Sequence, residues 1–241
     1  MPDTRTHRGP HPEDARLFAP EARPQLRDAT ADLCWLLSRG YVTPSALQVV
    51  GDRYRLNARQ RTAVARSACS DADRARRTAH RVEAAQLAAQ TLWLDGYNVL
   101  TSVEAALAGG VLLAARDGTY RDMASMHGSY RKVAETRPAV DLIGRQIASL
   151  GASECLWYLD RPVSNSGRLK KLIEEMAAAA GWSWRVELVA DPDAILAEAD
   201  QVIATADSAI LDRCRAWFNL ARETVARHVP EAVVVELGDC G

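Results

Sequence analysis

The amino-acid sequence predicts an α/β protein, in which a parallel sheet flanked by helices is preceded by a small all-helical region. Three observations predict this fold class. Up to Gln90 the apolar residues recur at helical spacing, and no alternating β-branched run indicates a strand. From Thr91 onward short apolar runs alternate with helical segments, which is the pattern of a parallel sheet wrapped by helices. The 241 residues, of which 48% are hydrophobic, are enough to build a sizeable core in one large domain or two small ones.

Residues 1–20 are expected to form a flexible tail, because they are rich in proline and carry mixed charge without a hydrophobic period. The all-helical region then covers residues 21–90. Its first helix has apolar residues at positions i, i+4, i+7 and i+8, and it stops at Gly40. The apolar residues that share this face are Ala29, Leu33, Leu36 and Leu37.

Three further helices are expected in this region. Thr43 followed by Pro44 gives the second helix an N-cap and a proline at its first position. Asn57 is the N-cap candidate of the third helix. The fourth helix begins at Asp71 or Asp73 and continues as a long segment rich in alanine and arginine to the end of the region.

The remaining chain, residues 91–241, is expected to form the α/β domain. An apolar run that meets the Asp117-Gly118 pair is the strongest short signal for a β-hairpin. Elsewhere strands and helices alternate, so the strands should be parallel. The expected strands are residues 91–95, 155–160, 184–190, 201–207 and 231–237, and the expected helices are residues 102–109, 135–150, 166–181, 191–199 and 208–228.

Several classes of protein are excluded by composition. The five cysteines lie far apart and never form a CxxC pair, which argues against a disulfide framework and against a cysteine zinc site. No apolar run approaches the roughly 18 residues that a membrane span needs. The amino-terminal segment has no apolar stretch of the kind found in secretory signals. We therefore expect no membrane partner and a cytoplasmic location.

The net charge of -1 conceals an asymmetry between the two regions. Up to Gln90 the chain has 15 Lys and Arg against 10 Asp and Glu, and the remainder has 15 against 21. The basic part would suit a polyanion, and the acidic part would suit metal ions. The helical region is thus expected to be an RNA-binding accessory unit or a docking surface, and the simpler explanation is that its arginines form a solvated face. If they bind no RNA, the region is a packing or dimerisation element that would support a homodimer. The arginines on which the first interpretation depends are Arg53, Arg55, Arg59, Arg61 and Arg66.

Aspartates follow four of the expected strands. In an open α/β sheet, ligands bind outside the carboxyl ends of the strands. Clustered carboxylates stay ionised together only with cations between them, and hard oxygen donors select Mg²⁺ or Mn²⁺. We therefore predict that these side chains converge on one edge of the sheet, and that the carboxylates of Asp95, Asp160 and Asp207 lie there within metal-bridging reach. The simpler explanation is that each aspartate caps the helix that follows it. The residues are Asp95, Asp160, Asp191, Asp193 and Asp207, with Asp212 about one helical turn later.

Ordered motifs resemble those of a known family. LDGYNVL resembles the opening motif of NYN domains, which are PIN-like nucleases, and LWYLD, DPDAILAEAD and VIATADSAIL follow in the order of the later motifs. GYVTPSALQVVGDRYRL and LDRPVSNSG are similar to a bacterial and archaeal family that joins a helical DUF434 region to a PIN-like DUF5616 region. The resemblance implies the fold of a metal-dependent ribonuclease. The RDGTYRDM hairpin is an addition to the common PIN core.

These features together predict a metal-dependent endoribonuclease that hydrolyses phosphodiester bonds of RNA. Its Mg²⁺ or Mn²⁺ would activate water and neutralise the phosphodiester during in-line attack. In this hypothesis Asp95, Asp160 and Asp207 are the catalytic metal ligands. Either Asp193 or Asp212 would complete the site.

Candidate nucleic-acid ligands lie in two segments and beside Asp95. Around the hairpin, basic residues are interleaved with tyrosines, and such pairs bind phosphates and stack on bases. The SNSG segment beside Asp160 precedes a helix and exposes N–H groups to an anion. A solvated hairpin face and a capped helix start are the simpler explanations. The candidates are Asn98, Arg121, Arg131, Lys132, Ser164, Asn165, Ser166 and Arg168.

Two other functions are compatible with the same residues. A non-catalytic RNA-binding or scaffold protein with a PIN-like fold would keep the basic surface and need no metal. A small phosphoester hydrolase would use the same carboxylates. Phosphate-binding loops of the GxGxxG and GxxxxGK[ST] types and the GxSxG elbow are absent from the sequence, so nucleotide binding by such loops and serine hydrolysis are not indicated.

Overall fold

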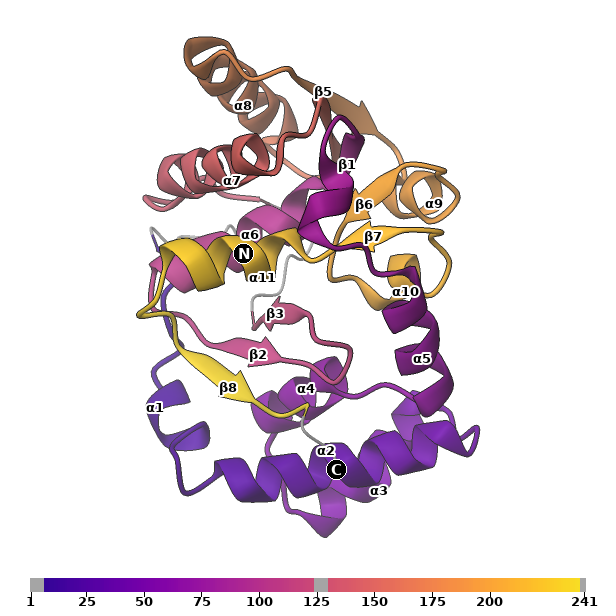
Figure 1. Ribbon diagram of the computed structural model, residues 1–241. Coiled ribbons are helices and arrows are strands. Elements are labelled where there is room, and N and C mark those ends of the chain that lie inside the picture. Colours follow the sequence, from indigo (N-terminus) through magenta and orange to yellow (C-terminus); the bar gives the residue numbers. More distant parts are fainter. Residues whose placement is uncertain (1–6, 124–129, 239–241) are drawn as a thin grey trace.

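A computed structural model describes residues 7–123 and 130–238 of the chain (Figure 1). It confirms the predicted α/β class, with a five-stranded parallel sheet flanked by helices and an amino-terminal helical region. The strand order is β5-β4-β1-β6-β7, and every neighbouring pair is parallel. The strands are β1 (Thr91–Asp95), β4 (Glu154–Asp160), β5 (Trp184–Val189), β6 (Val202–Ala204) and β7 (Trp217–Phe218).

Helices cover both faces of this sheet (Figure 1). Alternate residues of a strand point to opposite faces, so Leu94 packs into one core while its neighbour Trp93 packs into the other. The first core contains side chains of α6 (Gly96–Leu107), α7 (Thr136–Leu150), α8 (Ser166–Ala180) and α11 (Leu220–His228). The second contains side chains of α9 (Pro192–Ala197) and α10 (Ser208–Leu211).

The helical region has most of the predicted starts and stops, but the N-cap predicted at Thr43 is wrong: Thr43 is the first residue of its helix, and Val42 precedes it without a capping hydrogen bond from its side chain. Gly40 follows the first long helix with a φ of +82°, and Asn57 forms a capping box with Gln60. The predicted fourth helix is shorter than expected: it ends at His80, because the next residues are extended and pair with β7. The elements are α1 (Asp14–Leu17), α2 (Arg23–Ser38), α3 (Thr43–Arg53), α4 (Ala58–Ser67), α5 (Asp71–His80) and the 3₁₀ helix η1 (Ala84–Leu87).

The flexible tail predicted over residues 1–20 is wrong for the part that the structure describes. Arg8 forms an ion pair with Glu104, which is fully buried in α6. Leu17 lies in the same hydrophobic core as α2 and α4. Buried charge pairing and apolar contact therefore fix this segment, although its proline-rich composition hides both.

A second, three-stranded sheet lies between the helical region and the main sheet (Figure 1). It contains β2 (Leu112–Ala114), β3 (Tyr120–Asp122) and β8 (Val234–Glu236), in the order β3-β2-β8. The hairpin predicted at Asp117-Gly118 is confirmed: β2 and β3 are antiparallel, and Gly118 has a φ of +81°. The last predicted strand, however, joins this small sheet and not the parallel one.

The small sheet connects two hydrophobic cores. Leu113 and Val235 pack with the helical region, whereas Leu112, on the opposite face of β2, packs with α6. The helical region and the α/β part of the chain therefore share a continuous apolar contact across this sheet.

The single helix predicted over residues 208–228 is two helices with β7 between them. Trp217 and Phe218 are buried and pair with β6 as the edge strand of the main sheet. The Trp217 indole donates a hydrogen bond to the carbonyl of Arg77 at 2.6 Å, which ties this edge to α5. Within the described residues, no helix is both long and apolar enough to cross a membrane.

Candidate functional site

The strand order of the main sheet reverses at β1, which is therefore the switch point of the sheet. The strands that follow it in sequence, β4 and β5, lie on one side of it, and β6 and β7 lie on the other. Open α/β sheets bind ligands in the crevice that forms outside the carboxyl ends of the strands at such a switch point. Asp95 is the last residue of the strand at this position.

The strand register directs two carboxylates to the same side. Asp95 of β1 is the direct partner of Tyr158 of β4, and partnered residues of parallel strands point to the same face. Asp160 follows Tyr158 by two residues and therefore shares its face. The ring of Tyr158 contacts Trp93 in the core that α9 and α10 cover, with centroids 5.0 Å apart. Asp95 and Asp160 thus project toward the starts of these two helices.

An open cleft of about 680 Å³ occupies this edge of the sheet. Four of the predicted aspartates line it, each from a different segment of the chain, and they are accompanied by residues of α4, α6 and β3. The lining residues are Ala65, Arg66, Asp95, Tyr97, Asn98, Thr101, Ser102, Arg121, Asp122, Asp160, Asp193, Ala206, Asp207, Ser208 and Ala209.

Asp95 is buried, with 8% of its surface exposed. Its Oδ2 accepts a hydrogen bond from the Thr205 hydroxyl at 2.8 Å, and that hydroxyl oxygen accepts one from the Asp207 backbone N–H at 2.9 Å. Burial raises the pKa of Asp95 to about 7; the Thr205 hydrogen bond opposes this shift, and the negative charges of Asp207 and Asp193 add to it. The carboxyl group is therefore held in place while its charge is disfavoured.

The neighbouring carboxylates also interact. Burial raises the pKa of Asp193, and the charges of Asp207, Asp160 and Asp191 raise it further. Burial and the charge of Asp191 raise the pKa of Asp160, against a hydrogen bond from its own backbone. This mutual repulsion at one edge of the sheet is what a cation in the cleft would relieve.

Helix capping accounts for part of the aspartate pattern. Asp207 Oδ1 accepts hydrogen bonds from the backbone N–H groups of Ala209 at 2.7 Å and Ile210 at 3.4 Å, so it caps α10 while lining the cleft. Asp191 caps α9 through the N–H of Ala194 at 3.0 Å and does not line the cleft. The capping explanation is therefore sufficient for Asp191 only.

Asp212 is not brought to the cleft, contrary to its place among the predicted metal ligands. Arg77 of α5 binds its carboxylate through two nitrogens at 2.8 and 3.0 Å, and Arg76 binds it at 2.9 Å. These arginines come from the helical region, more than 130 residues away in sequence. The ion pairs use the carboxylate to hold α5 against the end of α10.

The donor chemistry of the cleft suits a hard cation, because five aspartates line it and carboxylate oxygens are hard donors. Across the described ranges, no three acidic, histidine or cysteine side chains stand as a ready-made ligand set for one ion. Asp95, Asp160 and Asp207 line one cleft together with Asp193, and metal-bridging reach between their carboxylates stays a prediction.

Asn98 and Arg121 are the two predicted nucleic-acid ligands that line the cleft. Asn98 Oδ1 accepts a hydrogen bond from the Ala206 N–H at 2.8 Å. Arg121 is buried and donates to the carbonyls of Ala206 at 2.8 Å and Arg66 at 2.7 Å, and to Asp117 at 2.6 Å. Arg121 therefore holds three chain segments together, which is a structural role that its sequence context did not indicate.

The other predicted nucleic-acid ligands lie outside the cleft lining. Asn165 has a φ of +67°, and its side-chain amide donates to the Tyr130 carbonyl at 3.0 Å. Ser166 is buried and donates to the Arg161 carbonyl at 3.3 Å. Side chains on the surface are those of Arg131, Lys132, Ser164 and Arg168.

Asp122 lines the cleft, although the sequence analysis did not single it out. Asp122 Oδ2 accepts hydrogen bonds from the hydroxyls of Thr101 at 3.2 Å and Ser102 at 3.1 Å. Arg66 of α4 donates to the Asp122 carbonyl, so the helical region contributes to the cleft wall. The repeated Arg-Asp pair of the hairpin was the only available signal for Asp122.

Two of the other arginines of the helical region are paired within the fold. Arg59 donates to the buried carboxylate of Asp14, at 2.8 Å through Nη2. Arg61 donates to Asp52 at 2.6 Å and to the Leu56 carbonyl at 3.0 Å. For these two arginines, the interpretation as a packing element describes the structure better than RNA binding does.

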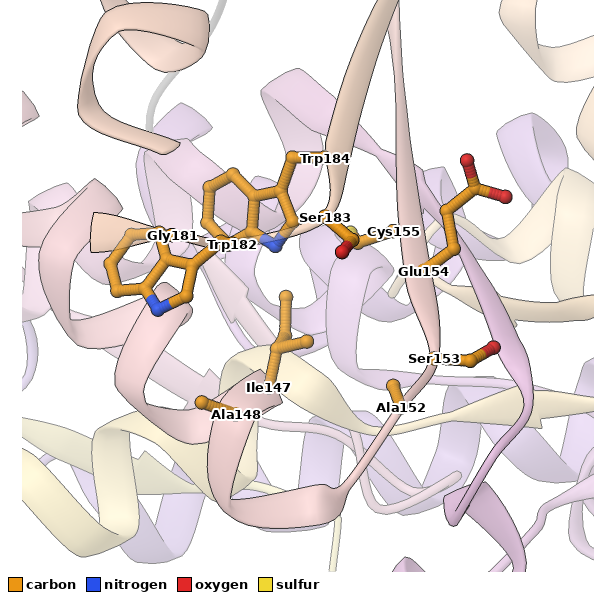
Figure 2. Close-up of a pocket in the computed structure, with 10 residues that line it drawn as sticks. All are labelled: Ile147, Ala148, Ala152, Ser153, Glu154, Cys155, Gly181, Trp182, Ser183 and Trp184. Atoms are coloured by element: carbon orange, nitrogen blue, oxygen red, sulfur yellow. The ribbon is translucent and has the colours of Figure 1, made fainter. Parts of the chain in front are cut away.

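A second pocket, of about 200 Å³, lies at the opposite edge of the sheet, where β4 and β5 begin. Figure 2 shows the indole rings of Trp182 and Trp184 side by side in it, and their centroids are 4.7 Å apart. The Trp182 ring lies against Gly144 of α7, where a Cβ atom would come within 2.0 Å of it. The two tryptophans thus hold α7 on the sheet.

Comparison with known proteins gives three findings. The protein-family model described as "Domain of unknown function (DUF5616)" matches residues 84–223, and the one described as "Protein of unknown function (DUF434)" matches residues 25–80. The uncharacterized protein MJ0935 of Methanocaldococcus jannaschii is 30% identical over 154 residues, which cover 64% of this chain and 74% of that protein. No solved structure matches the chain at a significant level. The resemblance to DUF434 and DUF5616 expected from the sequence is confirmed.

Proposed function

We propose that this chain, which belongs to the DUF5616 family, is a metal-dependent endoribonuclease with a PIN-like active site. The observation that carries the proposal is the convergence of Asp95, Asp160, Asp193 and Asp207 on one cleft. These residues follow four different strands, and the cleft lies at the switch point of the sheet. The ordered DGYN, LWYLD and T-x-D motifs that resemble NYN domains contain three of the four residues.

The four carboxylates would hold Mg²⁺ or Mn²⁺, and the bound metal would supply activation of water and neutralisation of the phosphodiester charge. The chain prepares these ligands in two ways. Thr205 fixes the orientation of Asp95, and the Asp207 N–H fixes Thr205. Asn98 holds the backbone of Ala206, which precedes Asp207. One hydrogen-bonded unit therefore positions two of the ligands.

Cation binding to the cleft should depend on pH. Since the pKa of Asp95 is about 7 in the metal-free protein, this group keeps its proton over much of the acidic range. A cation must displace that proton to use Asp95 as a ligand. Affinity for Mn²⁺, measured by calorimetry, should therefore rise between pH 6 and pH 8.

The proposal is tested by cleavage of an end-labelled single-stranded RNA in Mg²⁺ or Mn²⁺, with EDTA as the metal-free arm. The wild-type chain should cut the RNA, and Asp95→Asn should not. Asp191→Asn is the matched control, because it makes the same charge change beside the site at a residue outside the cleft, and asparagine caps a helix as well as aspartate. A wild-type chain that binds no Mn²⁺ and leaves RNA intact would refute the proposal.

A further inference from the structure

Tyr97 carries a polar group that the fold does not use. It lies in the first turn of α6, two residues after Asp95, and it lines the cleft. Only 3% of its surface is exposed, and its ring packs against Tyr130 with centroids 5.2 Å apart. Among residues 7–123 and 130–238, the buried Tyr97 hydroxyl has no hydrogen-bond partner.

Other hydroxyls close to Tyr97 are satisfied, which makes this one an exception. The Tyr130 hydroxyl donates to Glu104 Oε1 at 2.5 Å and lies 3.0 Å from the Thr136 hydroxyl oxygen. Thr101 donates to the Tyr97 carbonyl at 2.8 Å. Buried polar atoms of folded proteins nearly always have a partner, so an orphaned one that lines a cleft is available to a ligand bound there.

The position of the hydroxyl limits the chemistry of that ligand. Tyr97 and Asp160 line the same cleft. A phenol that keeps its proton is a hydrogen-bond donor, so its partner must offer an acceptor oxygen. Beside carboxylates that would hold a cation, a phosphate oxygen meets both conditions, because it accepts hydrogen bonds and binds the same cation.

We propose that Tyr97 is a substrate-binding residue, whose hydroxyl donates a hydrogen bond to a non-bridging phosphate oxygen of a nucleic-acid strand in the cleft. The inference rests on the proposed function to the extent that it assigns the strand to the same cleft. It adds to that function a direct hydrogen bond from the protein to the phosphate, made by a residue that is not one of the proposed metal ligands.

The experiment compares Tyr97→Phe with Tyr130→Phe, since each variant removes one hydroxyl and keeps its ring. Both are made in an Asp95→Asn background, so that cleavage does not consume the probe. Binding of a labelled single-stranded RNA and of a DNA with the same sequence is followed by fluorescence anisotropy in Mg²⁺. Thermal unfolding of each variant is measured in parallel.

Tyr97→Phe should weaken binding of RNA and DNA alike by roughly 10-fold, because both carry the phosphate. Its melting temperature should stay the same or rise, since an unpartnered buried hydroxyl is removed. Tyr130→Phe should melt at a lower temperature, because it loses the bond to Glu104, and should bind normally.

Four results would overturn the inference. The first two are an unchanged affinity of Tyr97→Phe for nucleic acid and a lower melting temperature of that variant. The third is a loss of affinity for RNA but not for DNA, which would assign the contact to the ribose 2′-hydroxyl. The fourth is that the Asp95→Asn protein itself binds no nucleic acid. Failure of the proposed function gives a different result. In that case the chain with Asp95 intact leaves RNA uncut, while Tyr97→Phe still weakens binding.

Discussion

Replacing Asp95 with asparagine should stabilise the metal-free protein, and the gain should grow with pH. Burial raises the pKa of Asp95 from an ordinary 3.8 to about 7, so the folded protein holds this proton more tightly than the unfolded chain does. The stabilising contribution of the proton is complete below pH 3.8 and is lost as the pH rises to about 7. The asparagine side chain of the variant has no proton to lose over this range.

The magnitude follows from the width of this pH window. Each pH unit between the two pKa values changes the free energy of unfolding by about 1.4 kcal/mol. Between pH 5 and pH 8 the advantage of Asp95→Asn over the wild type should therefore increase by up to roughly 3 kcal/mol. For a chain of this length that corresponds to a difference in melting temperature of roughly 6–12 °C.

The assay is thermal unfolding of both proteins in EDTA at pH 5 and pH 8, followed by circular dichroism. Every other titrating group is common to the two proteins, so the change in their difference reports on Asp95. A constant difference across this range would refute the assignment of a raised pKa. A large loss of stability at pH 8 would show that the ionised carboxylate is an anchor for Thr205.

Two further predictions concern charged groups of the fold. Burial would raise the pKa of Asp117, but the charges of Arg121 and Arg77 and a hydrogen bond from Thr119 lower that pKa to about 2. Removing this buried charge leaves its arginine partners unpaired, so Asp117→Asn should reduce the free energy of unfolding, measured in urea, by about 3–5 kcal/mol. The same change at exposed Asp52 should cost less than about 1 kcal/mol. Arg59 and Arg61 form ion pairs within the fold, so the double variant Arg59→Ala, Arg61→Ala should have a lower melting temperature and an unchanged salt dependence of RNA binding. If the affinity of the double variant for RNA falls less steeply with salt than that of the wild type, the two arginines contact phosphates instead.

The sequence predicts the site aspartates because their position depends on a local rule. A residue that ends a strand of a parallel sheet lies at the carboxyl edge whatever the rest of the chain does, and this is true of Asp95 and Asp160. Asp207 follows β6 in the same way, and its role as a helix cap is equally local. The hairpin at Gly118 is predictable for the same reason, since the turn requires a positive φ.

The features that the sequence does not reveal depend on distant partners. Asp212 has the spacing of a metal ligand, but two arginines of α5 bind it. Trp217 fits the period of a helix, yet it lies in the edge strand of the sheet, because its segment pairs with β6 and its indole donates a hydrogen bond to the Arg77 carbonyl. In each case a tertiary contact made by α5 or its neighbours overrides a correct local pattern.

These distant contacts make the helical region part of the cleft itself. Asp117 of the hairpin binds Arg77 of α5 and Arg121 of β3 through the same oxygen, at 2.6 Å each. Arg121 in turn donates to the carbonyl of Ala206, the residue whose N–H is held by Asn98 and which precedes Asp207. A buried chain of charged hydrogen bonds thus runs from the helical region to the backbone of a candidate metal ligand. A fully satisfied buried network of this kind makes a fold rigid, so the joining of a DUF434 region to a DUF5616 region in one chain has a physical reason.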